Sequence, residues 1–468
     1  MAKDIYVEFL KLTGFEEDEI KEFLPDFRTA CERLYLTKDD VKFGAEEWIP
    51  SQFDIALKGV RKSLGCLVKE GVDLCKTPEY KKKGIKIVYG ILPAIGVYYY
   101  ALKLAAPDKV YVGFPDLFLV CFLQMFFHKL NPTLEEAERS GISYGCRHCA
   151  LNKGRYTARK WGVIPPPDMS WIWGFVCDEG PKTDEFIKEY FDPEWKTYIT
   201  RLPHDTSLGT IEDEDDERVE YLARQMREGF EFVQKEIGIK VSDEKVMEAF
   251  DLRMSFLKRM TQMRQLATAD PQPYRGNEMF ILGMPREMPF NTGLGPMSEA
   301  MDIAIEETKQ RVANKEGVLP KGAPSLMYEI IPYPQPWIVN MFAENGVGVM
   351  PGGPTEKQLK PPRFKDPHMA SAEAWLKSSI TINAGYKAEQ ISERLLKYKF
   401  DGLLLGFFDF DRWLGSDDKL IGRLVEEKTK LPVFYIEGDF WEDRDYSLEA
   451  LRTRIESICE IIKMRKVS

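Results

Sequence analysis

Cysteine, histidine and long apolar stretches are all scarce in this chain of 468 residues. Eight cysteines are too few for a scaffold held together by disulfides at this length. The longest apolar stretch, about residues 110–127, is interrupted by Pro115, Asp116 and Gln124, and it is short for a bilayer span of ~20 residues. The first residues lack the basic flank and apolar core of a secretory signal. We therefore expect a cytoplasmic protein without a membrane segment.

An excess of positive charge is also lacking. Lys and Arg number 65 against 75 Asp and Glu, which gives a net charge of −10. A field of this sign does not favour nucleic acid as a partner. The composition, 44% hydrophobic and 30% charged, is typical of globular proteins with buried cores. At roughly 100–200 residues per domain, the length predicts two to four compact units.

Strand patterns that alternate with helix patterns predict an α/β fold with two Rossmann-like lobes, each built on a parallel sheet. Short β-rich runs near residues 85–93, 109–116, 325–330, 400–407 and 432–439 are each followed by an amphipathic or apolar helix pattern. We expect a helical N-terminal segment broken at Pro25 and Pro50. The predicted parts are a helical segment at 1–84, a first lobe at 85–240, a helical linker at 241–324 and a second lobe at 325–468.

Three of the cysteines lie close together in the sequence. Cys146 and Cys149 form a Cys-x-x-Cys pair, and Cys177 follows at the end of a predicted strand. A pair at this spacing can place two sulfurs on one metal, and a third thiol can complete one face of a tetrahedron. The neighbouring Arg147 and Lys153 favour thiolates over thiols. The pattern predicts that the three thiols share one metal centre.

The residues alone leave several interpretations of this cluster open. Three inert buried thiols are one, because free cysteine packs as a small hydrophobe. A redox dithiol is disfavoured by the Arg-His pair between the cysteines and by the third cysteine. A cluster with three thiolates and one open iron competes with structural zinc. Zinc needs a fourth ligand, and the chain offers four histidines: His128, His148, His204 and His368.

An ordered set of motifs resembles the subunits of the 2-hydroxyacyl-CoA dehydratase and benzoyl-CoA reductase family, which also includes double-cubane cluster proteins. The similarity extends loosely over residues 85–200 and more clearly over residues 325–465. The motifs are Cys-Asp-Glu-Gly-Pro-Lys at 177–182, Phe-Asp-Gly-Leu-Leu-Leu-Gly-Phe at 400–407, Leu-Pro-Val-Phe-Tyr-Ile-Glu-Gly-Asp at 431–439 and Arg-Thr-Arg-Ile-Glu at 452–456.

The resemblance implies a [4Fe–4S] cluster, or a larger iron–sulfur cluster, near the interface of the two lobes. Transferred by position, its ligands would be Cys177 together with Cys146 or Cys149. The third cysteine of the family follows the second-lobe strand, where this chain instead reads Gly-Phe-Phe-Asp-Phe-Asp-Arg-Trp at 406–413. The additional thiol of the Cys-x-x-Cys pair could replace it, or Asp409 or Asp411 could supply an oxygen ligand.

Further side chains are candidates for the cofactor and the chemistry. His204, next to Asp205 and near Arg201, could transfer a proton, although a loop network explains the same residues. Asp409 is the second catalytic candidate. An arginine in the segment at 274–278 could contact an anion, or the segment could be an exposed turn. The candidates around the cofactor are Arg147, Lys153, Asp178 and Trp173, the last of which could instead be a core residue.

The resemblance also implies partners. An ATP-hydrolysing activator, itself a [4Fe–4S] protein, would deliver one electron at a time for the reduction of an acyl-CoA-like small molecule. A homologous subunit would complete a homodimer or a heterodimer. The alternative is a scaffold or electron-transfer subunit with structural zinc or a relay cluster, whose homologous partner carries the catalytic site. The absence of the third family cysteine favours this alternative.

Overall fold

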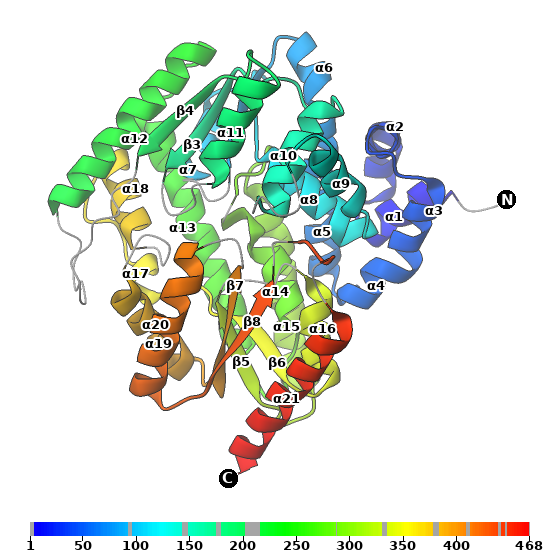
Figure 1. The fold of residues 1–468 in the computed structure, drawn as a ribbon, viewed down its shortest axis with the longest axis vertical. Helices are drawn as coiled ribbons and strands as arrows, with labels where there is room; N and C mark the ends of the chain where they lie inside the picture. Colours follow the sequence, from blue (N-terminus) through cyan, green and yellow to red (C-terminus); the bar gives the residue numbers. More distant parts are fainter. Residues whose placement is uncertain are drawn as a thin grey trace.

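A computed structural model describes residues 4–91, 96–142, 148–174, 179–201, 216–286, 288–329, 335–377, 383–408, 412–438, 441–444 and 447–467. Helices form the first part of the chain and lie at the right of Figure 1. They are α1 (Ile5–Leu12), α2 (Glu17–Arg33), α3 (Lys38–Phe43), the π-helical turn η1 (Gly44–Trp48), α4 (Ile49–Gln52), α5 (Lys58–Cys75) and α6 (Thr77–Lys82).

The expected helix break at Pro25 is wrong, because Pro25 lies inside α2. A proline there removes one backbone hydrogen bond, but Pro25 is exposed, so water can reach the freed carbonyl group. The opposite face of α2 buries Ile20, Phe27 and Cys31. This packing outweighs the local preference. The expected break at Pro50 is wrong as well, because α3, η1 and α4 follow one another without a gap and Pro50 lies within this helical run.

The first sheet contains four parallel strands in the order β2-β1-β3-β4. Because β2 and β3 flank β1 on opposite sides, the order of the strands reverses between β1 and β3. The strands are β1 (Lys86–Tyr89), β2 (Val110–Gly113), β3 (Met169–Gly174) and β4 (Thr197–Arg201). The helices are α7 (Gly96–Ala105), α8 (Pro115–Phe127), α9 (Asn131–Arg139), α10 (Ala150–Lys160), α11 (Glu179–Tyr190) and α12 (Asp216–Ile237).

The second sheet repeats this topology with the order β6-β5-β7-β8, again fully parallel. The predicted α/β fold with two parallel sheets is therefore confirmed. The strands are β5 (Ser325–Glu329), β6 (Gly348–Pro351), β7 (Gly402–Phe408) and β8 (Val433–Gly438). The helices are α16 (Pro336–Glu344), α17 (Glu356–Leu359), α18 (Pro367–Leu376), α19 (Ala384–Lys397), α20 (Arg412–Thr429) and α21 (Leu448–Val467).

Four described helical elements connect the two sheets in the sequence. They are α13 (Asp243–Leu266), α14 (Gly276–Gly283), the 3-10 turn η3 (Met284–Arg286) and α15 (Gly295–Asn314). In Figure 1, α14 and α15 lie level with the second sheet. α15 packs closely on α5, because Gly59 brings the α5 backbone so near that a Cβ atom there would lie 2.6 Å from the carbonyl oxygen of Ala300. The N-terminal helices are thus part of the same core. The division of the chain into four parts stays a prediction.

The described helices include none that combines the length and the apolar composition needed to cross a membrane. The most apolar of them, α8, has 13 residues, all of them buried. A helix of that length and burial is a core helix. The apolar stretch near residues 110–127 is therefore the strand β2 followed by α8, as the sequence predicted.

Candidate functional site

In each sheet, one of the predicted site residues follows a strand next to the position where the strand order reverses. Cys177 comes three residues after the last residue of β3, and Asp409 directly follows β7. Ligands of open parallel sheets bind outside the carboxyl ends of the strands at such points. Cys177 and Asp409 themselves lie outside the described residues. The strands β3 and β7 are described, and we take the regions beyond their carboxyl ends as the candidate site.

Cys149, the described member of the cysteine cluster, begins α10. It is the N-cap residue of this helix, and its side chain is buried. The backbone N–H of Cys149 donates a hydrogen bond of 3.0 Å to Oε2 of Glu179, and Nδ2 of Asn152 reaches the same oxygen at 3.2 Å. Glu179 is the first residue of α11 and comes two residues after Cys177. This contact joins the chain segments that carry two of the three cysteines.

Lys153 lies one turn after Cys149 on α10 and is almost fully buried. Its Nζ contacts Oε1 of Glu138 at 3.1 Å. Arg444, from the segment after β8, binds both carboxylate oxygens of Glu138 and also pairs with the buried Glu442. Burial alone would raise the pKa of the Glu138 carboxyl group, but Arg444 and Lys153 hold it below its usual value. Lys153 therefore has a structural role, and a role toward a cofactor stays a prediction.

Arg155, two residues further along α10, is fully buried. Its Nε and Nη2 contact the Asp184 carboxylate at 2.7 and 3.3 Å. Nη1 donates to the carbonyl oxygen of Gly90 at 2.8 Å, and Nη2 donates to Oγ of Ser170 at 2.7 Å. Nη1 also lies 3.4 Å from Oδ1 of Asp116. The guanidinium group therefore connects β1, α8, α10, β3 and α11, and this hub fixes the helix that begins at Cys149.

Trp173, which we considered as a shield for a cofactor, lies in an aromatic cluster of the first lobe. Its ring centroid is 4.6 Å from that of Trp171 and 6.2 Å from that of Tyr98, and both indoles are buried. The Tyr98 hydroxyl contacts Nδ1 of His368 at 2.9 Å. Trp173 thus packs in the core, as the alternative interpretation held, and contact with a cofactor stays a prediction.

Two of the four candidate histidines belong to contact networks of their own. His368 lies between Tyr98 and Asp243, whose Oδ1 is 3.5 Å from Nε2, and burial lowers the pKa of this imidazole. Nε2 of His128 lies 2.5 Å from Oδ2 of Asp443, and its ring stacks on Trp48 at 4.3 Å. His204 lies outside the described residues, and a fourth zinc ligand from any of the four histidines stays a prediction.

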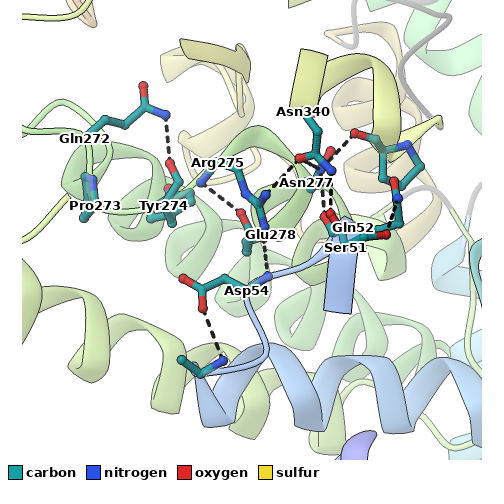
Figure 2. A network of polar contacts seen from close by, with 12 residues as sticks. Ser51, Gln52, Asp54, Gln272, Pro273, Tyr274, Arg275, Asn277, Glu278 and Asn340 are labelled. Atoms are coloured by element: carbon teal, nitrogen blue, oxygen red, sulfur yellow. Dashed lines mark hydrogen bonds and ion pairs between the residues drawn. The ribbon is translucent and has the colours of Figure 1, made fainter. Parts of the chain in front are cut away.

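The segment around Arg275 is not an exposed turn, since it forms a buried junction (Figure 2), and a contact of Arg275 with an anion stays a prediction. The fully buried Glu278 accepts hydrogen bonds from the backbone N–H groups of Arg275 and Asp54, at 2.9 and 2.8 Å. Nη1 of Arg275 donates to Oδ1 of Asn340 at 2.9 Å, and Nδ2 of Asn340 donates to the carbonyl oxygen of Ser51. Its contacts hold the N-terminal helices to α14 and α16.

The remaining site predictions fall outside the described residues. Within the described ranges, no group of three or more His, Cys, Asp or Glu side chains is arranged to hold a metal ion. Cys149 is thus the member of the predicted metal set whose surroundings the structure shows. The residues outside the described ranges are Cys146, Arg147, Cys177, Asp178, His204 and Asp409.

Sequence reasoning missed three of the residues that position the site. Glu179 had a local signal, because a carboxylate at the start of a predicted helix is a common N-terminal residue. Glu138 and Arg444 had none, since isolated charges in helices and loops are usually solvated. Only the approach of the segment 441–444 to α9 and α10 shows their function.

The chain was compared with known protein families. The family model described as 2-hydroxyglutaryl-CoA dehydratase, D-component, matches residues 105–462. This range includes strands β2 to β8 and the residues Glu138, Cys149 and Arg444. No curated protein matches the chain.

Proposed function

Since the chain belongs to the 2-hydroxyglutaryl-CoA dehydratase D-component family, we propose that it is an iron–sulfur subunit of a 2-hydroxyacyl-CoA dehydratase or an aryl-CoA reductase-like enzyme. Its Cys146, Cys149 and Cys177 would hold a [4Fe–4S] or larger cluster. The substrate would be a CoA thioester or a similar small molecule that accepts single electrons of low potential.

The hydrogen bond from the Cys149 backbone to Glu179 is the observation that carries the proposal. It holds the start of α10 against the start of α11, and the two cysteine-bearing segments precede these helices. The N-terminus of a helix carries partial positive charge and stabilises nearby anions. The N-termini of α10 and α11 lie together, and both would stabilise cysteine thiolates and the negative charge of a cluster bound by them.

The donor set fits iron–sulfur chemistry. Thiolate sulfur is the usual ligand of such clusters, and the Cys149 side chain is buried, which suits a site closed to water. When bound, the cluster would supply electrons of low potential, in a range that reaches about −700 mV. Thiolates bind zinc equally well, so the metal has to be measured.

The described residues would orient this site rather than react. Glu179 fixes the backbone of Cys149, and Asn152 shares the same carboxylate oxygen. Lys153, Glu138 and Arg444 connect α10 to the segment after β8, so the second half of the chain holds the site in place. Asp409 and His204 would serve as the groups that contact substrate or move a proton.

Two protein partners follow from the proposal. A separate ATP-hydrolysing [4Fe–4S] activator would deliver the electrons, and a homologous subunit would complete a homodimer or a heterodimer. Mixing the reduced activator, ATP and the anaerobic chain with a 2-hydroxyacyl-CoA tests the first partner through electron transfer. Size-exclusion chromatography with light scattering tests the second.

Metal analysis after anaerobic purification tests the core of the proposal. We expect about four irons with matching acid-labile sulfide per chain, or more for a larger cluster. Cys149→Ser should lose most of this iron, because a missing ligand is seldom neutral for a metal site. Cys121→Ser is the matched control, since Cys121 is a buried thiol in the middle of α8. One zinc per chain without visible absorption would instead support the non-catalytic alternative.

A further inference from the structure

A buried arginine beside the second sheet has no charge partner in the described part of the chain. Arg264, in the last turn of α13, is 1% exposed. Its Nε and Nη1 atoms have no hydrogen-bond partner among the described residues. A buried donor that is left unpaired costs free energy, and an unpaired buried charge costs more. A bound anion would remove this cost.

Aromatic rings cover Arg264 without satisfying its donors. The guanidinium carbon lies 4.6 Å from the ring centroid of Tyr398 and 4.4 Å from that of Phe400. Rings stabilise the cation through its flat faces, whereas the N–H groups of a guanidinium point outward in its plane. Burial lowers the pKa of Arg264 to about 10, so the group still carries its charge at neutral pH. The in-plane donors remain available for an acceptor.

Two more buried groups near Arg264 lack partners. They are Nη2 of Arg394 and the hydroxyl of Tyr398, in side chains that are each 5% exposed. Arg394 is close enough to Arg264 for its charge to contribute to the lowered pKa of Arg264. Nη1 of Arg394 pairs with Oε1 of Glu329 at 2.6 Å, so this arginine is neutralised. Glu329 therefore neutralises Arg394, and the positive charge of Arg264 is left without a counterion in the described ranges.

The loop after β6 lies against both arginines. The carbonyl oxygen of Gly353 accepts a hydrogen bond of 3.2 Å from Nη1 of Arg394. Gly353 has a φ of +72°, and a Cβ atom there would lie 3.2 Å from Cγ of Arg264. A Cβ atom on Gly352 would lie 2.9 Å from Nη1 of Arg394. Glu329 ends β5 and Gly353 follows β6, whereas Tyr398 and Phe400 come just before β7, so the cluster extends from the carboxyl edge of the sheet toward its amino edge.

We propose that Arg264, Arg394 and Tyr398 bind a small oxyanion, such as a phosphate or carboxylate group, at the place where α13 and α19 meet beside the second sheet. The anion accepts hydrogen bonds from the unpartnered nitrogens and the hydroxyl, and it neutralises the remaining positive charge. A guanidinium fork matches the geometry of such oxyanions. The proposal does not depend on the proposed function.

Thermal unfolding of the full chain in different anions tests this site. Wild type is compared in chloride, inorganic phosphate and acetate at matched ionic strength, with coenzyme A as a further arm. We expect phosphate or acetate to raise the melting temperature saturably, by about 2–4 °C. A rise with coenzyme A alone would assign the site to a phosphate group of a larger ligand.

Two variants make the assignment specific. Arg264→Met removes the charge but keeps an apolar side chain of similar length between the rings, and it should abolish the rise. Arg259→Met is the control, because Arg259 lies on the same helix and pairs with the exposed Asp302. The proposal fails if no anion raises the melting temperature of wild type. It also fails if Arg264→Met retains the full rise, which would mean adventitious binding elsewhere.

Discussion

Arg444 binds Glu138 with two parallel hydrogen bonds, Nη2 to Oε1 at 2.7 Å and Nη1 to Oε2 at 3.1 Å, across 306 positions of sequence. Glu138 also accepts from Lys153, which lies one turn after Cys149. The segment that follows β8 therefore contacts, through one carboxylate, the helix on which Cys149 begins. This pairing links the second half of the chain to the candidate metal site.

Arg444→Gln should destabilise the protein by about 1–3 kcal/mol, because Glu138 and Glu442 lose a shared partner in a partly buried place. Urea unfolding measures the loss. Arg139→Gln is the control, since Arg139 is exposed and its pair with Glu136 should contribute less than about 1 kcal/mol. Equal effects of the two variants would contradict a special role for Arg444.

Glu179→Ala should lower the iron content of anaerobically purified protein, because the Cys149 N–H and Asn152 lose their common acceptor. Glu179→Gln keeps a carbonyl oxygen at this position and should retain more iron. Glu185→Gln, on the exposed face of α11, should leave the iron content unchanged. Full iron in Glu179→Ala would show that this contact does not hold the metal site.

Arg155→Met should destabilise the fold by about 3–5 kcal/mol, because Asp184 and Asp116 are then buried without their cation. Adding Asp184→Asn should recover part of this loss by removing one of the stranded charges. Lys160→Met, on the same helix but more exposed, should cost much less. Chemical denaturation compares the four proteins, and a double variant as unstable as Arg155→Met would argue against a charge effect.

Glu70 should make stability depend on pH. Burial, helped by the charge of Asp73, raises the pKa of this carboxyl group to about 8. The folded state therefore holds the proton more tightly than the unfolded state. The stabilisation is complete below the ordinary pKa of glutamate and is lost as the pH rises to about 8, by up to about 1.4 kcal/mol per pH unit.

Urea unfolding at several values between pH 5 and 8 checks this sign. Glu70→Gln cannot titrate and should show a shallower loss of stability over this range than wild type. Glu248→Gln is exposed on α13 and should keep the wild-type slope. A wild-type slope in Glu70→Gln would mean that Glu70 does not titrate in this window.

The sequence determined the fold class. Each β-rich run is followed by a helix pattern, and parallel strands require such a crossover, so two parallel sheets could be predicted. The ordered motifs determined the family, and the spacing of Cys146, Cys149 and Cys177 determined the candidate metal set. These signals are local, because periodicity and spacing lie within short windows. Where packing between distant segments competes with a local rule, as at Pro25 in α2, the local prediction fails.

Only the tertiary structure decided which charges act together. Glu138, Arg444 and Arg264 read in the sequence as ordinary surface residues, yet they are wholly or largely buried and meet partners or rings far away in the chain. The strength of an ionic contact depends on burial and distance, and both follow from how the two lobes pack. No periodic pattern encodes a contact across 306 positions, and for that reason the supports of Cys149 could be found only in three dimensions.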